Sequence, residues 1–181
     1  LGEPRTPLFR TVSLFDHRFQ TYTTFTVPRR YTNLKFINGG SRGTLVSSDD
    51  TEKRAHVAIM KLNPVLSEHR EAQTFYRELI LRKSIVHPNV VQTLSVFTPQ
   101  SILDDFQDIY IVMTLMQYDL ETVIYKTRSD HKTLSFLIYQ ILCAVNHLHR
   151  EGVILRLWSQ RRLFTEVAQL WARNRLQGRK E

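Results

Sequence analysis

The chain has 181 residues, 42% of them apolar and 23% charged, and it carries a formal net charge of +8. The length is sufficient for one domain with a sizeable core, and the composition is that of a globular protein rather than a disordered one. The single cysteine, Cys143, excludes an intramolecular disulfide, and no group of cysteines and histidines has the spacing of a metal site.

The distribution of charged and apolar residues further limits the classes of protein to which the chain can belong. Seven basic residues and two acidic ones lie in residues 154–181, so the positive excess belongs mainly to the C-terminal tail. No basic stripe with interleaved aromatic residues runs through the rest, and nucleic-acid binding is not expected. The longest strongly apolar run, residues 109–116, is too short to span a bilayer, and residues 1–25 lack the apolar core of a signal peptide. These features favour a cytoplasmic or nuclear protein without a membrane span.

The N-terminal part of the chain is interpreted as an extension followed by a sheet. Residues 1–24 are predicted to form a flexible N-terminal extension. Beyond residue 30, short β-type runs alternate with polar turns and predict an antiparallel meander. Its three strands are residues 31–37, 44–48 and 56–62, with breaks at residues 38–40 and 49–51.

A helix is predicted next, over residues 70–85, because Phe75, Leu79 and Ile80 form an apolar stripe. The Pro-Asn pair at 88–89 ends this segment. Two further strands are predicted at residues 91–97 and 109–113.

Two helices are predicted after the last strand. The first is short, at residues 120–125, and the second covers residues 134–150 and is closed by Gly152. One face of the longer helix carries the apolar residues Leu137, Ile141, Val145 and Leu148. Five strands with one helix between the third and the fourth, followed by a helical region, indicate an α+β fold.

Several short motifs follow one another in an order that is more specific than any of them alone. A glycine-rich turn, as at residues 38–43, is by itself typical of many hairpins. Here it is followed by Val-Ala-Ile-Met-Lys at 57–61, Tyr-Arg-Glu-Leu at 76–79, His-Pro-Asn at 87–89 and Thr-Leu-Met at 114–116. This order resembles the small lobe of a protein kinase, a five-stranded antiparallel sheet with one helix.

The resemblance extends to the Jun N-terminal kinases and related stress-activated MAP kinases. The motifs that carry it are Phe-Thr-Val-Pro at 25–28, Arg-Tyr-Thr-Asn-Leu at 30–34, Phe-Thr-Pro-Gln at 97–100, Phe-Gln-Asp-Ile-Tyr-Ile-Val-Met at 106–113 and Leu-Ile-Tyr-Gln-Ile-Leu at 137–142. It implies the small lobe and hinge at residues 25–116, the first helices of the large lobe at 117–154, and a divergent basic tail at 155–181.

The resemblance implies an ATP site built from the glycine-rich hairpin, the third predicted strand and the hinge. Gly40 and Gly43 match the second and third glycines that let backbone amides close over the phosphates, whereas Asn38 replaces the first. Leu45 replaces the valine that covers the adenine. The implied nucleotide-binding residues are Ile37, Gly40, Gly43, Leu45, Ala58, Met113, Thr114, Leu115 and Met116.

The charged residues of the family's site are incompletely matched. Met60 replaces the lysine that contacts the phosphates, and the adjacent Lys61 is expected to point away from the nucleotide because strand side chains alternate. A register slip or a bulge would be the alternative, since it would bring Lys61 into place. Glu78 matches the helix glutamate that pairs with the family's lysine, and Arg82 either pairs with Glu78 or extends into solvent.

The match ends near residue 154. Leu157 stands where the family has the aspartate that accepts the proton of the substrate hydroxyl, and no Asp-Phe-Gly follows to hold magnesium. The catalytic set is therefore not intact and the magnesium site is missing. Weak ATP binding and impaired or absent phosphoryl transfer are expected.

Three functional readings stay open. The chain is a truncated kinase-derived domain that binds nucleotide weakly, or a pseudokinase-like regulator that binds proteins of the MAP kinase pathway, or a faulty or alternative transcript of a complete serine/threonine kinase. The helix at 134–150 is expected to expose an apolar face, because only the first helices of the large lobe are matched. An amphipathic helix in the basic tail would either cover this face or bind a calmodulin-like groove or an anionic membrane.

Overall fold

The computed structural model describes residues 8–16, 20–40, 43–62, 69–102, 107–116 and 131–153. The chain forms two compact units. The first comprises Leu1–Tyr76 and Thr93–Leu115, and the second comprises Arg77–Gln92 and Met116–Glu181. Helix α1 (His69–Ser84) contributes residues to both units.

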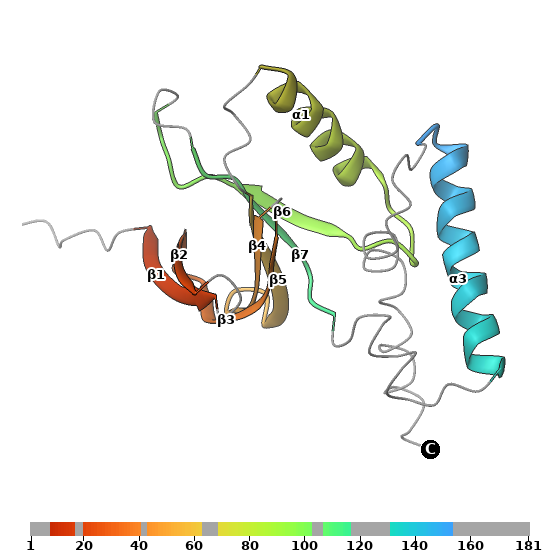
Figure 1. The fold of residues 1–181 in the computed structure, drawn as a ribbon, viewed down its shortest axis with the longest axis horizontal. Helices are drawn as coiled ribbons and strands as arrows, with labels where there is room; N and C mark the ends of the chain where they lie inside the picture. Colours follow the sequence, from red (N-terminus) through yellow and green to blue (C-terminus); the bar gives the residue numbers. More distant parts are fainter. Residues whose placement is uncertain are drawn as a thin grey trace, which may run out of the picture. The chain divides into compact units, whose positions relative to one another are not determined.

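The first unit contains a five-stranded antiparallel sheet with the strand order β3-β4-β5-β7-β6 (Figure 1). Its strands are β3 (Tyr31–Gly40), β4 (Gly43–Asp50), β5 (Ala55–Leu62), β6 (Thr93–Phe97) and β7 (Tyr110–Thr114). Together with α1, which follows β5, they confirm the predicted α+β fold and its five strands.

Two predicted breaks between the strands are wrong. β3 does not stop at Asn38 but continues through Gly40, and residues 49–50 belong to β4 rather than to a turn. In both places pairing with the neighbouring strand satisfies the backbone hydrogen bonds, so the local preference of asparagine, glycine and aspartate for turns is overridden.

A two-stranded sheet precedes the five-stranded one. β1 (Phe9–Asp16) and β2 (Thr21–Pro28) pair antiparallel along their whole length, from Phe9 opposite Pro28 to Asp16 opposite Thr21. The prediction of a flexible extension over residues 1–24 is therefore wrong for the described residues of these strands. Threonine, valine and aromatic residues dominate both strands, and such residues favour a pleated sheet even without a continuous apolar run.

The main core lies between this hairpin and one face of the five-stranded sheet. Phe25 and Val27 of β2 are fully buried together with Val46, Ile59 and Val112 of the sheet. In Figure 1 the hairpin lies beside β3. The face of the sheet that packs against the hairpin is called the hairpin face below, and the opposite face is called the distal face.

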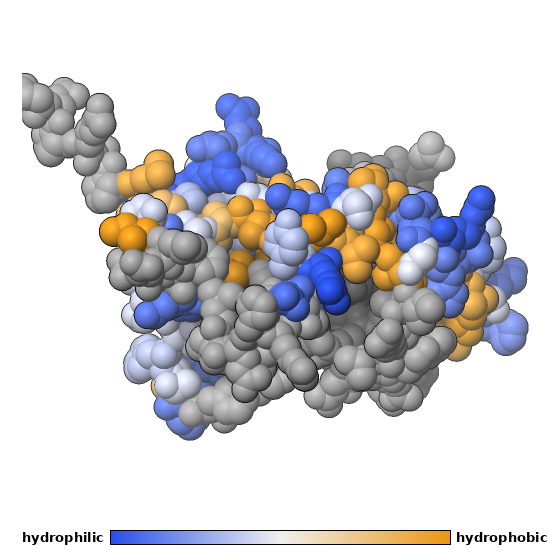
Figure 2. Space-filling view, turned by 90° about the horizontal axis from the view of Figure 1, so that it is seen from above, coloured by the Kyte–Doolittle hydropathy of each residue, from blue (hydrophilic) through white to orange (hydrophobic). Residues whose placement is uncertain are grey.

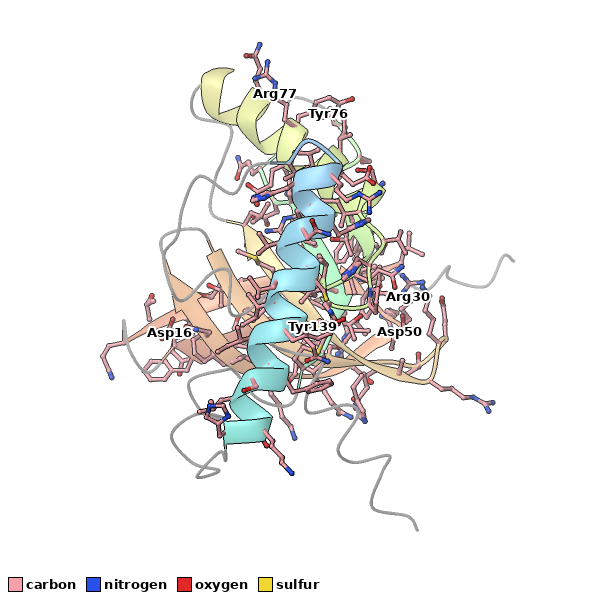
Figure 3. All side chains as sticks on the ribbon, turned by 90° about the vertical axis from the view of Figure 1, so that its right-hand side faces the viewer. Asp16, Arg30, Asp50, Tyr76, Arg77 and Tyr139 are labelled. Atoms are coloured by element: carbon pink, nitrogen blue, oxygen red, sulfur yellow. The ribbon has the colours of Figure 1, made fainter. Side chains whose placement is uncertain are left out.

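The turn between β4 and β5 is held by a buried carboxylate. Asp50 is 2% exposed, and its Oδ1 accepts hydrogen bonds from the backbone N–H groups of Glu52 and Lys53 at 3.1 and 3.2 Å. Arg30 lies beside Asp50 and donates to Glu52 at 2.8 Å (Figure 3). This capped turn fixes the register with which β5 enters the sheet.

The second unit contains helix α3 (His131–Arg150), which covers the predicted helix at 134–150. Its buried residues are Leu137, Gln140, Ala144 and Leu148. The predicted apolar face is confirmed at both ends, whereas Ile141 and Val145 are only half-buried. Gln140 and Ala144 take the central buried positions, which shifts the buried stripe slightly around the helix.

Gly152 ends α3 as predicted. Its φ angle of 75° lies in the left-handed region, where glycine is favoured. The backbone N–H of Val153 donates to the carbonyl of Leu148 at 2.8 Å, and that of Gly152 donates to the carbonyl of His149 at 3.1 Å. These two bonds are the Schellman pattern of a helix C-terminus.

The loop after α1 is joined to α3 within the second unit. Asn89 donates from Nδ2 to the backbone carbonyl of Gln140 at 3.1 Å, and the rings of His87 and His147 stack with centroids 4.7 Å apart. The backbone N–H of Asn89 also donates to Nδ1 of His87 at 3.0 Å. The His-Pro-Asn motif thus acts as a local structural anchor.

Helix α3 also exposes apolar side chains, as expected from the sequence: Phe136, Ile138, Tyr139 and Leu142. Tyr139 is labelled on the helix in Figure 3, and apolar surface of the described residues is orange in Figure 2. Neither α1 nor α3, the two helices among the described residues, combines the length and hydropathy needed to cross a bilayer. The short helix predicted at 120–125 and the basic tail from 155 onward lie outside the described residues.

Candidate functional site

Five side chains from three strands lie together on the distal face of the sheet. Leu45 pairs with Met60 and Met60 pairs with Ile111, while Ala58 pairs with Met113. Paired residues of antiparallel strands project from the same face, as do residues two apart in one strand. Ala58 and Ile111 are buried and the others are half-buried. The structure therefore brings together three of the predicted nucleotide-binding residues, Leu45, Ala58 and Met113, around Met60.

Lys61 lies on the hairpin face, opposite to Met60. Pairing between β4 and β5 runs without interruption from Asp50 opposite Ala55 to Gly43 opposite Leu62. The register slip or bulge that would have moved Lys61 to the distal face is therefore absent from β5. The predicted alternation of Met60 and Lys61 is confirmed.

The ammonium of Lys61 is engaged on the hairpin face. Nζ donates to the backbone carbonyl of Thr24 at 2.9 Å and forms an ion pair with Oδ1 of Asp108 at 3.0 Å. It also lies 5.8 Å from the centroid of the Tyr110 ring, within the range of a cation–π contact. Lys61 therefore links β5 to the hairpin.

The glycine-rich segment is an extension of the β3–β4 pairing, with Gly39 opposite Thr44 and Gly40 opposite Gly43. A Cβ atom on Gly43 would lie 2.0 Å from the backbone oxygen of Lys61, and the φ angle of Gly43 is 147°. A Cβ atom on Gly39 would lie 2.7 Å from Oδ2 of Asp16. Around Gly40, in contrast, no atom of the described residues beyond its chain neighbours lies within 4 Å of such a Cβ. Packing against backbone thus explains glycine at 43. At 39 the end of the Asp16 side chain would have to move, and at 40 the described residues give no packing reason for glycine.

The remaining predicted nucleotide-binding residues are Ile37 in β3 and residues 114–116 at and after the end of β7. Ile37 is 44% exposed and sits at an irregularity in the β3–β4 register. Thr114 ends β7 opposite Val57, so its side chain lies on the hairpin face and only its backbone is available beside Met113. Leu115 and Met116 follow and are half-buried.

Glu78 and Arg82 form an ion pair within α1. Nε and Nη2 of Arg82 donate to the same oxygen of Glu78, Oε1, at 3.1 and 3.0 Å. The spacing is i, i+4, with the acid on the N-terminal side, which is the favourable orientation. The hypothesis that Arg82 pairs with Glu78 is confirmed over the alternative in which it extends into solvent.

Leu157, the residue that stands where the resembled family has its proton-accepting aspartate, lies outside the described residues. Within the part of the chain that the structure describes, no group of three or more histidine, cysteine, aspartate or glutamate side chains is arranged to hold a metal ion.

Residues 31–156 match the family model of the protein kinase domain. Because this match covers more than half of the chain, the chain belongs to the protein kinase domain family. The five-stranded antiparallel sheet and α1 are the small lobe of that domain, as the sequence predicted.

One relative is GLH-binding kinase 1 of Caenorhabditis elegans, which is 45% identical to this chain over 148 residues. The aligned region covers 82% of this chain but 38% of the relative. The chain therefore spans well under half of the length of the relative that it matches.

The partners of Lys61 were not predicted from the sequence. Alternation placed Lys61 on the face away from the nucleotide, but what covers that face depends on the hairpin, most of which falls in the extension predicted to be flexible over residues 1–24. Thr24 and Asp108 lie 37 and 47 positions from Lys61 in the sequence, so no local pattern links them to it.

Proposed function

We propose that the chain is part of a serine/threonine kinase of the stress-activated MAP kinase family, in which ATP is bound weakly and phosphoryl transfer is impaired or absent. The observation that carries this proposal is Met60, a thioether at the distal-face position on β5. The neighbouring cation, Lys61, is held on the other face by Thr24 and Asp108. Removal of one preorganised electrostatic donor typically lowers turnover roughly 10²- to 10³-fold.

The assignment to the stress-activated branch is supported by sequence motifs. Phe-Thr-Val-Pro at 25–28 closes β2, and Phe-Thr-Pro-Gln at 97–100 closes β6. Both motifs resemble those of the Jun N-terminal kinases. A cytoplasmic or nuclear location follows from this assignment.

Gly40 supports a remaining role in nucleotide binding. It has no positive φ angle, and a Cβ atom there would meet no atom of the residues that the structure describes. Neither its conformation nor its packing against these residues therefore requires glycine at this position, whereas a phosphate group approaching the backbone would. Leu45, Ala58 and Met113 on the same side of the sheet would contact the adenine through apolar surface.

The second reason for impaired transfer lies in the sequence beyond the described residues. The isobutyl group of Leu157 cannot accept a proton, and residues 158–181 contain no Asp-Phe-Gly to hold magnesium. Phosphoryl transfer depends on positioning and on charge neutralisation, so the losses at Met60 and Leu157 compound.

Thermal unfolding with and without magnesium and ATP tests the proposal, together with a peptide phosphorylation assay. The wild-type chain should show a small ATP-dependent rise in Tm and no phosphate transfer. Gly40→Ala should remove the rise while leaving the Tm without nucleotide unchanged, and this second measurement serves as its control. Phosphorylation that Gly40→Ala or Glu78→Gln abolishes would contradict the proposal.

A non-enzymatic regulator that binds proteins of the MAP kinase pathway is the alternative. It is favoured by the exposed apolar side chains of α3, among them Phe136, Tyr139 and Leu142. The relative in Caenorhabditis elegans carries a binding partner, GLH, in its name. A pure binding module should show no stabilisation by ATP, so the same thermal measurement separates the two functions.

A further inference from the structure

The edge of β2 that does not face β1 is bound by two side chains of the five-stranded sheet. Lys61 donates to the carbonyl of Thr24 at 2.9 Å, and the hydroxyl of Tyr110 accepts a hydrogen bond from the N–H of Thr26 at 3.0 Å. Lys61 and Tyr110 are register partners on β5 and β7. Two neighbouring strands thus satisfy two backbone groups of the same edge strand.

Lys61 and Tyr110, the two side chains that bind β2, are themselves held in place. The carboxylate of Asp108 binds Lys61 at 3.0 Å, and both side chains are largely shielded from solvent, at 20% and 26% exposure. The Tyr110 ring is fully buried, stacks on Phe97 with centroids 4.9 Å apart, and lies 5.9 Å from Phe25 of β2. The attachment is therefore more rigid than an ordinary surface ion pair.

The other strand of the hairpin reaches the glycine-rich segment. Asp16, the last residue of β1, is 2% exposed, and its Oδ2 lies where a side chain on Gly39 would begin, at 2.7 Å. Strand β1 also contacts β3 directly. Because β1 and β2 pair without a register shift over eight positions each, a displacement of β2 carries Asp16 with it.

The main chain of Lys61 meets the same segment from the other side. Its carbonyl oxygen lies 2.0 Å from the position of a Cβ on Gly43. One residue therefore contacts the hairpin through its side chain and the start of β4 through its backbone. The glycine-rich segment is bounded by Asp16 at Gly39 and by Lys61 at Gly43.

We propose that Lys61 is a positioning residue that holds the β1–β2 hairpin on the sheet, and that the hairpin, through Asp16, holds the glycine-rich end of β3. Binding of the hairpin to the sheet is thereby coupled to the geometry of the distal face, where the nucleotide is proposed to bind. The relevance of this coupling to nucleotide rests on the function proposed above, whereas the coupling itself does not.

Amide hydrogen exchange of the whole chain, measured by NMR without nucleotide, tests the coupling. Lys61→Met removes the ammonium and keeps the apolar stem. Exchange at Thr26 and at Gly39 should become roughly three- to tenfold faster, as the loss of one ordinary hydrogen bond allows. Exchange at Ile59 in the centre of the sheet should stay unchanged.

Two further variants serve as controls for Lys61→Met. Lys61→Arg should restore slow exchange. Lys53→Met, in the exposed turn after β4, is the matched control that should behave as wild type.

Tyr110→Phe provides a second variant in case Lys61→Met does not fold. It keeps the buried ring and removes the hydroxyl, which accepts from the Thr26 N–H and also forms a hydrogen bond with the Asp108 side chain. Faster exchange at both Thr26 and Gly39 is again required. Faster exchange at Thr26 alone, or at neither position, would overturn the proposal.

A separate arm tests the link to nucleotide. Magnesium and ATP added to the wild-type chain should slow exchange at Thr26, although this residue lies on the hairpin. If ATP changes nothing while Lys61→Met still accelerates exchange at Gly39, the proposed nucleotide binding fails and the coupling stands.

Discussion

Met60 and Lys61 are adjacent in β5, yet Met60 pairs beside Leu45 and Ile111 on the distal face while Lys61 binds Thr24 and Asp108 on the hairpin face. The sheet therefore contains a lysine near the expected position but on the wrong side for a ligand of the distal face. Strand geometry separates the two sides absolutely, because no rotamer of Lys61 passes through the sheet. Within β5, the departure from the expected lysine is consequently confined to position 60.

Met60→Lys should increase the affinity for ATP. A charge-assisted hydrogen bond contributes about 1.5–3 kcal/mol, which corresponds to an increase of roughly 10- to 100-fold. Isothermal titration calorimetry measures the change, and Met60→Gln is the matched control because it has similar length and no charge. An equal gain for adenosine, which has no phosphate, would show that the added lysine does not act on phosphate. Peptide phosphorylation should stay absent, because Leu157 is unchanged.

Gly43→Ala should destabilise the fold whether or not nucleotide binds. The added Cβ would overlap the backbone oxygen of Lys61, and the φ angle of 147° is unfavourable for alanine. The expected loss in the free energy of unfolding is about 2–4 kcal/mol. Urea denaturation without nucleotide measures it, with Gly40→Ala as the control that should stay within about 0.5 kcal/mol of wild type. Equal stability of the two variants would contradict the packing explanation for Gly43.

Arg82→Met should weaken α1 only slightly. The ion pair with Glu78 is partly exposed, and such i, i+4 pairs contribute about 0.3–0.5 kcal/mol. A double-mutant cycle with Glu78→Gln isolates this coupling energy, and it should decrease at high salt. Arg77→Met is a suitable control because Arg77 is an exposed arginine on the same helix (Figure 3). A coupling energy of zero at low salt would show that the observed pair contributes nothing to stability.

Acidification should weaken the second unit through His87. Burial, and next the charge of the stacked His147, lower the pKa of His87 below its ordinary value of 6.5. Between the lowered pKa and 6.5 the unfolded chain binds more protons than the folded one, so stability is full above 6.5 and falls as the pH decreases below it. Protonation of Nδ1 would also remove the acceptor for the Asn89 N–H.

His87→Gln should flatten the decrease in unfolding free energy between about pH 7 and pH 5, the range in which histidine titrates. His149→Gln, on the exposed end of α3, is the control and should keep the wild-type pH dependence. Urea denaturation at a series of pH values measures the effect. Identical slopes for His87→Gln and wild type would exclude His87 as the titrating group.

The sequence correctly predicted those features that depend on the residues of a single strand or helix. The runs around Ile59 and Val112 predicted strands, and the position of Gly152 predicted the end of α3, because periodicity and the left-handed conformation are local properties. The alternation of Met60 and Lys61 followed from strand geometry alone. The pairing of Glu78 with Arg82 was one of two open possibilities that helical spacing allowed.

The features that were missed depend on residues far apart in the chain. The hairpin is stabilised by burial of Phe25 and Val27 against the sheet, and its own sequence has no uninterrupted apolar run. The continuation of β3 through Asn38 depends on the partner strand rather than on the preference of asparagine for turns. Likewise, the bond from Asn89 to Gln140 spans 51 positions, so nothing in the His-Pro-Asn motif indicates its partner.

The different surroundings of Gly40 and Gly43 indicate which substitutions such a domain would accumulate if it were no longer selected for catalysis. A lineage under pressure only to keep a folded sheet would retain glycine at 43, where the chain itself occupies the space, and would accept alanine or serine at 40. Persistence of Gly43 in a degenerate kinase is therefore no sign of a working nucleotide site. Gly40 is the position whose retention or decay would record whether a ligand still matters.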